Sequence, residues 1–452
     1  MSCSWCVGCW VHGRQPNDTR DGGVSALLDH APRLSVGEAK AIASRRYGRT
    51  GRAHELTSER DQNFLIEDDD GAIVLKVANA LEERALLDAQ QQVLALLARH
   101  GVPAPRVVCT VDGEPLTEAN GASDRRHFVW AVSRLPGLLL ADVAHRSPEL
   151  LEDLGATIGR LSAALATFES RALDREFHWD LAHAAERIAA ARRSMRDESF
   201  GSAIDLTLDR ATRHVTPRAT ALPRAVIHND LNDYNILITG ERVSGVLDFG
   251  DMLYGWRVAD LAIAASYAML DAEDPLAVMA SLIRGAQREL PLVDGELEVI
   301  FELACLRLAL SAAIAIDQQL ARPENDYLGV SQAAIRRTLP RLTSVPHALA
   351  VAVARDAAGR EPIAGSERVR DWLFAHQDSF APVLGVDLRS ERTVVLDLSI
   401  ASSLVSGDPA ENVESELTPR IAAAMREAGV RVVIGRYDEP RLLYTAAFFG
   451  GP

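Results

Sequence analysis

The stretch from His228 to Asp251 constrains this chain more than any other part of its sequence. It reads HNDLNDYNILITGERVSGVLDFGD, so Asp230, Asn235 and Asp248 follow one another, with an apolar strand-turn-strand pattern between the last two. Such a hairpin would bring Asn235 and Asp248 to the same place. Phosphoryl transfer from a nucleotide needs these groups, because one carboxylate must meet the attacking hydroxyl while an amide and a second carboxylate hold a magnesium ion.

A lysine within an apolar strand is the next candidate. The segments 64–66 and 72–77 flank an acidic turn at 67–71 and predict an antiparallel hairpin, with Lys76 in its second strand. Edge strands often carry a lysine that discourages aggregation, which is the structural alternative. Together with the 228–251 stretch, however, Lys76 has the place of the strand lysine that grips the α- and β-phosphates of a nucleotide.

Periodic patterns around these two motifs predict the fold class. A helix over 36–47 and strands over 107–110 and 128–132 accompany the hairpin. From 139 to 345 helical spacing dominates, and the 228–251 stretch is the only strand-like interval there. We therefore expect an α+β, two-lobed fold, with a small antiparallel-sheet N-terminal lobe and a mainly helical C-terminal lobe.

The ends of the chain add further predicted units. The expected division is a disordered leader at 1–32, the sheet lobe at 33–134, the helical lobe at 135–345, a linker at 346–365 and a small α/β unit at 366–452. In the leader, Cys3, Cys6, Cys9 and His12 have a spacing that could supply four ligands to zinc, but no second knuckle follows. The C-terminal unit ends on an apolar segment without a closing element, as at the start of a truncated, larger fusion.

Two positions at the edge of the sheet lobe are expected near the nucleotide. The helix over 80–99 carries Gln90 where a glutamate would pair with the strand lysine. A neutral amide can still orient Lys76 by hydrogen bonding, and Asp88 or Glu83 is the alternative partner that would supply a charge. The chain would then cross between the lobes at 133–137, where backbone groups of Ser133 and Leu135 would pair with the base.

Charge and hydropathy limit the partners. The formal net charge of -15 disfavours nucleic acid and anionic membranes, since both would be repelled, and it suits a cationic small substrate. The same charge also serves solubility alone. The longest apolar run, 303–316, is interrupted by Arg307 and is shorter than the roughly 18–20 residues that cross a bilayer. No secretion signal is recognisable at the start, so a cytoplasmic protein without a membrane or nucleic-acid partner is expected.

Several segments together carry a family resemblance. The segments 58–64, 75–77, 101–105, 228–235 and 248–252 resemble the aminoglycoside phosphotransferase and choline kinase superfamily, and most closely its hydroxylysine kinase branch. The likeness covers about residues 33 to 345 and implies that the two expected lobes form a protein-kinase-like fold. It implies that Asp230 accepts or orients the proton of the substrate hydroxyl, that Asn235 and Asp248 ligate Mg²⁺, and that Lys76 holds the phosphates. His228 would brace the loop.

The resemblance also implies roles with open alternatives. Ser58 lies where a phosphate-covering turn is expected, but the segment has no glycine, and hydroxyl and amide groups would have to cap the phosphates. Asp233 and Asp251 are candidates for meeting an ammonium group of the acceptor. Asp260 is expected to anchor the catalytic loop, with contact to the acceptor as its alternative.

The expected function is that of a small-molecule kinase. It would transfer the γ-phosphoryl group of ATP or GTP to the hydroxyl of a hydroxylysine-like or ethanolamine-like amino alcohol, with Mg²⁺ as cofactor. An aminoglycoside or choline is the alternative acceptor, and a catalytically silent nucleotide-binding module is the second alternative, motivated by Gln90 and the missing glycine loop. Bacterial members of the branch occur fused to a peptidase-like domain and an aminotransferase. Aminotransferase-like modules, joined covalently or not, are therefore implied as partners.

Overall fold

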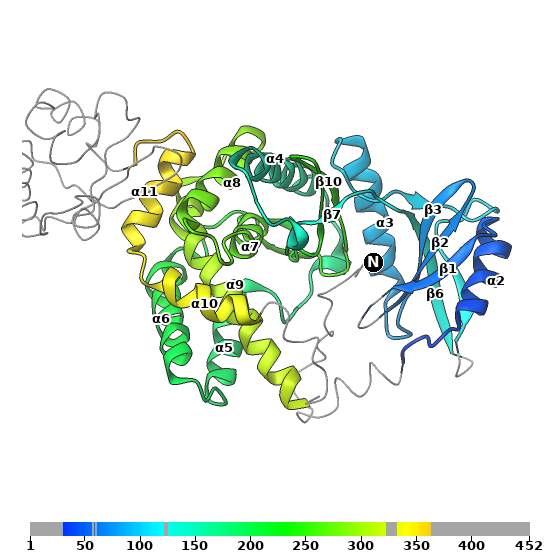
Figure 1. Ribbon diagram of the computed structural model, residues 1–452, viewed down its shortest axis with the longest axis horizontal. Helices are drawn as coiled ribbons and strands as arrows, with labels where there is room; N and C mark the ends of the chain where they lie inside the picture. Colours follow the sequence, from blue (N-terminus) through cyan, green and yellow to red (C-terminus); the bar gives the residue numbers. More distant parts are fainter. Residues whose placement is uncertain (1–29, 57, 59–60, 122–124, 322–331, 363–452) are drawn as a thin grey trace, which may run out of the picture.

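The computed structural model describes residues 30–56, 58, 61–121, 125–321 and 332–362. The predictions for the cysteine-containing leader and for the α/β unit from residue 366 onwards lie outside these residues. The described chain forms two lobes, a sheet lobe followed by a mainly helical one (Figure 1). The predicted α+β, two-lobed arrangement is confirmed.

The first lobe is built on a six-stranded sheet in which every pairing is antiparallel. The strands are β1 (Arg52–Leu56), β2 (Gln62–Asp68), β3 (Gly71–Val77), β4 (Val107–Val108), β5 (Thr117–Asn120) and β6 (Arg126–Ser133). Their order is β1-β2-β3-β6-β4, and β5 also pairs with β6. The hairpin expected around residues 67–71 is formed by β2 and β3. The polar strands β1 and β5 lack apolar alternation, which explains why the sequence did not reveal them.

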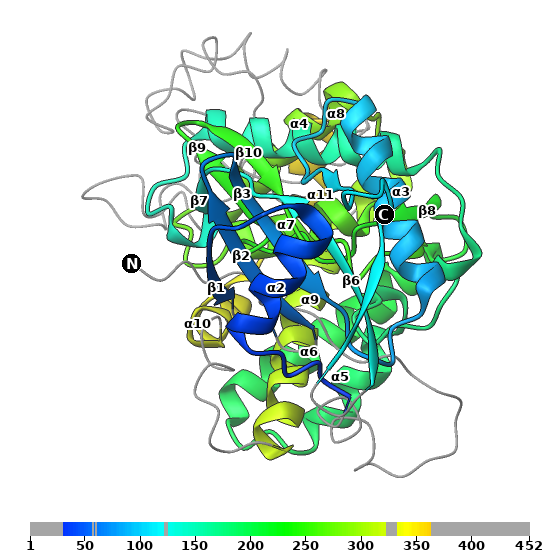
Figure 2. The same ribbon diagram turned by 90° about the vertical axis from the view of Figure 1, so that its right-hand side faces the viewer.

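Two helices cover opposite faces of this sheet (Figures 1 and 2). Helix α2 (Val36–Tyr47) begins at the capping box of Ser35 and Glu38, and helix α3 (Arg84–Arg99) starts four residues later than the sequence indicated. Side chains alternate along β3, so that Leu75 packs with α2 while Val74 packs with α3. Lys76 therefore lies on the face of the sheet that α3 covers.

The second lobe is mainly helical, as expected. Its helices are α4 (Pro148–Leu165), α5 (Ala184–Arg192), α6 (Glu198–His214), α7 (Ala259–Ala268), α8 (Pro275–Glu289), α9 (Asp294–Ala321), α10 (Gln332–Thr343) and α11 (His347–Ala357). Single-turn 3-10 helices lie at Leu140–Asp142 (η1), Arg171–Leu173 (η2), Leu181–His183 (η3) and Thr216–Arg218 (η4). Helices α4 and α8 pack backbone to backbone, because a Cβ on Gly155 or Gly285 would lie 2.0 Å from a carbonyl oxygen of the other helix.

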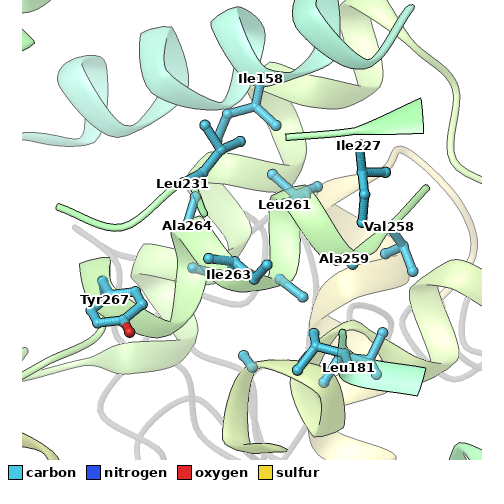
Figure 3. Close-up of a cluster of buried hydrophobic side chains, with 14 of the residues drawn as sticks. Ile158, Leu181, Ile227, Leu231, Val258, Ala259, Leu261, Ile263, Ala264 and Tyr267 are labelled. Carbon is cyan, nitrogen blue, oxygen red and sulfur yellow. The ribbon is translucent and has the colours of Figure 1, made fainter. Parts of the chain in front are cut away.

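Helix α7 is apolar on every side and buried throughout. Figure 3 shows it surrounded by Ile158 of α4, Leu181, Ile227 at the end of β8 (Arg224–Ile227), and Leu231 in the candidate catalytic loop 228–235. This packing fixes the start of the catalytic loop against the core of the helical lobe.

The range expected to be a linker, 346–365, contains helix α11, which packs on α8 and α9, with Leu349 and Val353 buried. The apolar stripe of α11 is completed only by these tertiary contacts. The expectation of a single strand-like interval within 139–345 is wrong, since β8 (Arg224–Ile227) and β11 (Leu253–Trp256) pair with each other outside the 228–251 stretch.

Two small sheets carry the candidate site. The predicted hairpin is present as β9 (Ile236–Thr239) and β10 (Arg242–Val246), and β7 (Leu138–Leu139) adds a third strand. The 228–235 loop connects β8 to β9, and the segment 247–252 connects β10 to β11. The backbone N–H of Val246 donates to the carbonyl of Pro103 at 2.7 Å, which ties this sheet to the segment following α3.

Helix α9 differs from its sequence interpretation. Over Asp294–Ile316 it is, among the described residues, the one helix long and apolar enough to cross a membrane, whereas the sequence indicated a shorter apolar run, 303–316, interrupted by Arg307. Of its most apolar window 89% is buried inside the lobe, which is typical of a core helix. The arginine within it is 1% exposed, so it must be satisfied internally.

Candidate active site

The two connecting segments meet at the hairpin base. The N–H of Leu247 donates to the carbonyl of Asn235 at 2.8 Å, which places Asn235 beside the residue that precedes Asp248. Asn229 and Asp248 both have left-handed backbones, with φ of 66° and 57°. Non-glycine residues hold such conformations only where their surroundings enforce them, and they concentrate at functional sites.

Asp230 is the buried centre of the site, with 2% of its surface exposed. Its Oδ1 accepts from Nδ2 of Asn232 at 2.9 Å and from Nη2 of Arg307 at 2.7 Å, and its Oδ2 accepts from Nδ2 of Asn235 at 2.7 Å. Burial raises the pKa of Asp230 well above its ordinary value, Arg307 opposes this rise, and the charge of Asp251 adds to it. The carboxylate is thus held in one orientation in a strongly perturbed environment, as expected of a general base.

His228 and Asp260 hold the loop in place. Nε2 of His228 lies 2.9 Å from the carbonyl of Leu247, and the N–H of Asp230 donates to Nδ1 at 3.3 Å, so the ring is neutral with its proton on Nε2. Burial lowers the pKa of His228 to about 4. Asp260 accepts from the N–H groups of His228 and Asn229 at 2.9 and 2.8 Å. Asp260 therefore anchors the loop, as the sequence favoured.

The donor set of Asn235 and Asp248 fits a hard cation. Both amide contacts of Asn235 to Asp230 are made by Nδ2, so its oxygen is the atom left to act as a ligand. Oδ1 of Asp248 accepts from the N–H of Gly250 at 3.3 Å. Within the described chain no cluster of three or more His, Cys, Asp or Glu is placed to hold a metal. Magnesium needs no such cluster, because it takes one or two protein oxygens and completes its shell with water and phosphates.

Lys76 reaches this site from the other lobe. Its Nζ lies 3.9 Å from Oδ1 of Asp248 and 5.4 Å from the ring centroid of Trp130, its partner across the sheet. Lys76 is one of only two lysines in a chain with 48 lysines and arginines, the other being Lys40. Gln90 is buried on α3, which packs on the same face of the sheet as Lys76. A contact between the two stays a prediction.

The expected base-contacting positions lie where the lobes join. The N–H of Ser133 donates to the carbonyl of Arg106 at 2.8 Å, and its hydroxyl accepts from the N–H of Arg106 at 2.9 Å. The carbonyl oxygen of Ser133 is therefore the group that we expect to accept a hydrogen bond from the nucleotide base. Leu135 packs on an apolar cluster of Leu139, Leu237 and Leu247, and its contact with a base stays a prediction. Ser58 is half-buried and stands between residues outside the described chain.

The two acids expected to meet an ammonium group differ in their surroundings. Asp233 is buried, and its Oδ2 lies 3.6 Å from the guanidinium of Arg146. Burial raises the pKa of Asp233 to about 6, with Arg146 opposing the rise. Arg146 thus takes the place of a cationic partner beside Asp233, which leaves Asp251 as the candidate for meeting an ammonium group. That residue is buried beside Asp230, close enough for its charge to raise the pKa of Asp230.

Sequence reasoning missed residues that reach the site from distant segments. Arg307 donates to Asp230 from the middle of α9, and its only sequence signal was a charge within an apolar run. Arg175 donates to the carbonyls of Gly250 and Met252 at 2.7 and 3.0 Å and so holds the turn after Asp248. No local pattern marks Arg175.

Comparisons with known proteins show which family and which fold the chain resembles. Residues 53–295 match the model of the phosphotransferase enzyme family. The chain is 30% identical over 336 residues to a hydroxylysine kinase of Xenopus laevis, covering 68% of this chain and 89% of that protein. It is 28% identical over 274 residues to a homoserine kinase of Pseudomonas aeruginosa, covering 57% and 78%. In fold it is similar to an amicoumacin kinase solved with AMP-PNP, Ca²⁺ and amicoumacin, with a TM-score of 0.53, 16% identity and coverage of 70% and 95%.

Proposed function

The chain belongs to the phosphotransferase enzyme family, and on this premise we propose that it transfers the γ-phosphoryl group of ATP or GTP to the hydroxyl group of an amino alcohol. The observation that carries the proposal is the environment of Asp230. Arg307, Asn232 and Asn235 hold its buried carboxylate by hydrogen bonds. Asp248 lies in the neighbouring connecting segment, and Lys76 approaches Asp248 from the opposite lobe.

Each residue has a defined task in this reaction. Asp230 accepts the proton of the acceptor hydroxyl as the oxygen attacks the γ-phosphorus, and Lys76 binds the phosphates of the nucleotide. Asn235 and Asp248 would hold Mg²⁺, which neutralises phosphate charge when bound. Catalysis of this kind depends on positioning and charge. The buried contacts around Asp230 and the backbone of Asp248 supply that rigidity.

We further propose a hydroxylysine-like or ethanolamine-like acceptor. Hydroxylysine and homoserine, the substrates in the names of the relatives, both carry an amino group and a hydroxyl group. Asp251 supplies a buried carboxylate beside Asp230, where an ammonium group of the acceptor would bind. Aminoglycosides and choline are the alternative acceptors. A catalytically silent module is disfavoured, because Lys76, Asp230, Asn235 and Asp248 are present together.

A panel of acceptors tests this preference. Wild-type protein, labelled ATP or GTP and Mg²⁺ are combined with 5-hydroxylysine, homoserine, ethanolamine, choline and an aminoglycoside, each beside an analogue without its amino group. Loss of one charge-assisted hydrogen bond costs about 1.5–3 kcal/mol, so the deaminated analogues should lose roughly 10- to 150-fold in kcat/KM. Asp251→Asn should raise the KM of the acceptor and leave that of the nucleotide near wild type. Equal effects on both KM values would assign Asp251 to metal binding or folding instead.

Lys76→Met should lower kcat/KM for the nucleotide by roughly 10- to 100-fold, since a charged contact to phosphate is lost. Lys40→Met is the matched control, because Lys40 is exposed on α2 and should be replaceable without effect.

The scarcity of lysine permits a direct check: an amine-reactive ATP analogue should label Lys76, and excess ATP should protect it. Labelling of Lys40 alone, or unchanged nucleotide kinetics in Lys76→Met, would remove Lys76 from the site.

A further inference from the structure

We propose that Arg175 is a positioning residue for the acceptor: it clamps the turn after Asp248 and thereby holds the carboxylate of Asp251 where the ammonium group binds. The inference rests on the proposed function and adds to it a residue outside the sequence motifs. Arg175 follows the short helix η2 in the segment between α4 and α5, 75 residues before the turn that it contacts.

One guanidinium binds the backbone on both sides of Asp251. Nη2 of Arg175 donates to the carbonyl of Gly250 at 2.7 Å, and Nε donates to the carbonyl of Met252 at 3.0 Å. Gly250, Asp251 and Met252 are all buried. Buried carbonyl groups need a donor, because an unsatisfied one costs free energy. Arg175 therefore fixes the short stretch of backbone from which the side chain of Asp251 projects.

The ring of Phe177 holds the guanidinium in turn. The Cζ atom of Arg175 lies 4.8 Å from the ring centroid of Phe177, which is buried in the same core cluster as Met252. The face of an aromatic ring attracts a cation. An arginine suits this place, because its planar guanidinium presents several donors in a fixed geometry, whereas the ammonium group of a lysine is a point charge on a flexible stem.

The clamp acts on Asp251 more directly than on Asp248. Asp248 is fixed at other points, since the N–H of Leu247 before it donates to the carbonyl of Asn235 at 2.8 Å across the hairpin base. Its own Oδ1 accepts from the N–H of Gly250 at 3.3 Å. The two clamped carbonyls instead belong to the residues that directly flank Asp251. Loss of Arg175 should therefore disturb the binding of the acceptor more than that of the nucleotide.

Arg175→Met removes both donors and keeps an apolar stem beside Phe177. With the most responsive acceptor of the panel, the KM of the acceptor should rise by roughly 10- to 100-fold, the usual effect of losing a group that orients a binding carboxylate. The KM of the nucleotide should stay within about threefold of wild type. Arg175→Lys returns the charge and should recover part of the loss. Equal rises in both KM values would overturn the proposal.

Arg224→Met is the matched control. Arg224 makes contacts of the same kind slightly further along the chain: its Nη2 donates to the carbonyl of Tyr254 at 2.7 Å, and its Cζ lies 5.3 Å from the centroid of that ring. Arg224 and Tyr254 are both exposed, so both KM values should stay near wild type in this variant. A rise in the acceptor KM as large as that in Arg175→Met would show that any loosening of β11 suffices, which would overturn the proposal.

A double variant tests whether Arg175 acts through Asp251. Two changes that affect one contact are not additive, whereas changes at independent sites are. Arg175→Met should therefore raise the acceptor KM far less in the Asp251→Asn background than in wild type. If the two changes multiplied their effects on the acceptor KM, Arg175 would act elsewhere, and the proposal would be overturned.

Hydrogen–deuterium exchange without any acceptor separates this inference from the proposed function. Amides of the segment 249–252 should exchange at least about tenfold faster in Arg175→Met than in wild type, while those of α7 stay equally protected. Unchanged exchange over 249–252, or an equal acceleration in α7, contradicts the role of Arg175 even in an active kinase. Faster exchange confined to 249–252 in a protein that phosphorylates nothing would instead contradict only the proposed function.

Discussion

Asp230→Asn should lower kcat by roughly 10²- to 10⁴-fold, the usual contribution of a general base. The exchange preserves size and removes only the proton-accepting charge, so the KM of the nucleotide should stay near wild type. Steady-state kinetics with a responsive acceptor, together with nucleotide binding measured directly, would show this separation. Nucleotide hydrolysis in the absence of acceptor should decrease as well, since water then takes the place of the hydroxyl.

Asp233→Asn is the control for that experiment. Asp233 is a second buried aspartate of the same loop, but it pairs with Arg146. The variant removes the buried carboxylate that pairs with Arg146, so the melting temperature should fall. The value of kcat should stay within about tenfold of wild type. If Asp233→Asn abolished turnover while Asp230→Asn left it intact, the two acids would have to exchange their roles.

Glu302→Gln should destabilise the protein by about 3–5 kcal/mol, because it leaves a buried arginine without its counter-charge. Glu302 accepts two hydrogen bonds from Arg210 at 2.7 and 2.9 Å, and Nδ1 of His347 lies 2.8 Å from the same carboxylate. Arg210 donates in turn to the carbonyls of Thr343 and Val345. This cluster joins α6, α9 and the start of α11. Unfolding in urea at neutral pH measures the loss.

The pH dependence of stability follows from the same carboxylate. Burial alone would raise the pKa of Glu302, but hydrogen bonds from His347 and Arg210 and the charge of Arg210 outweigh it and lower the pKa from 4.5 to about 2. Because the folded-state pKa is depressed, its contribution of roughly 3 kcal/mol is present above pH ~4.5 and is lost as the pH falls towards ~2. In Glu302→Gln this acid-dependent loss should be absent.

Glu298→Gln provides the comparison on the same helix, one turn earlier. Glu298 pairs with Arg218 at the surface, where both side chains are about one-third exposed, so its loss should cost at most about 1 kcal/mol. The double change Arg210→Met with Glu302→Leu should recover much of the stability lost in Glu302→Gln, since no unpaired charge remains. If Glu298→Gln and Glu302→Gln unfolded at the same urea concentration, the account of the Arg210, Glu302 and His347 cluster would be refuted.

The parts of the site that could be predicted lie close together in the sequence. The order of Asp230, Asn235 and Asp248 and the apolar segments between the last two define the hairpin locally, and alternation along β3 turns Lys76 towards the other lobe. The two-lobed fold follows from the same local patterns. Such patterns reflect backbone periodicity, which the sequence records directly.

The parts that could not be predicted depend on partners far along the chain. Asp233 and Asp251 look alike in the sequence, and only Arg146, brought in from before α4, distinguishes them. Arg307 lies 77 residues after Asp230 and reads locally as an interruption of an apolar helix. The position of α11 likewise depends on Glu302 and on the packing of α8 and α9. Tertiary contacts of this kind leave no periodic signal.

The central claim is tested most directly by identifying the product. Phosphorus NMR of wild-type protein with ATP or GTP, Mg²⁺ and 5-hydroxylysine or ethanolamine should show a phosphomonoester on the acceptor hydroxyl, formed in equal amount to the nucleoside diphosphate. The product should decrease with Asp230→Asn and persist with Asp233→Asn. Nucleoside diphosphate accompanied only by free phosphate across the whole acceptor panel, or no turnover at all, would contradict the account.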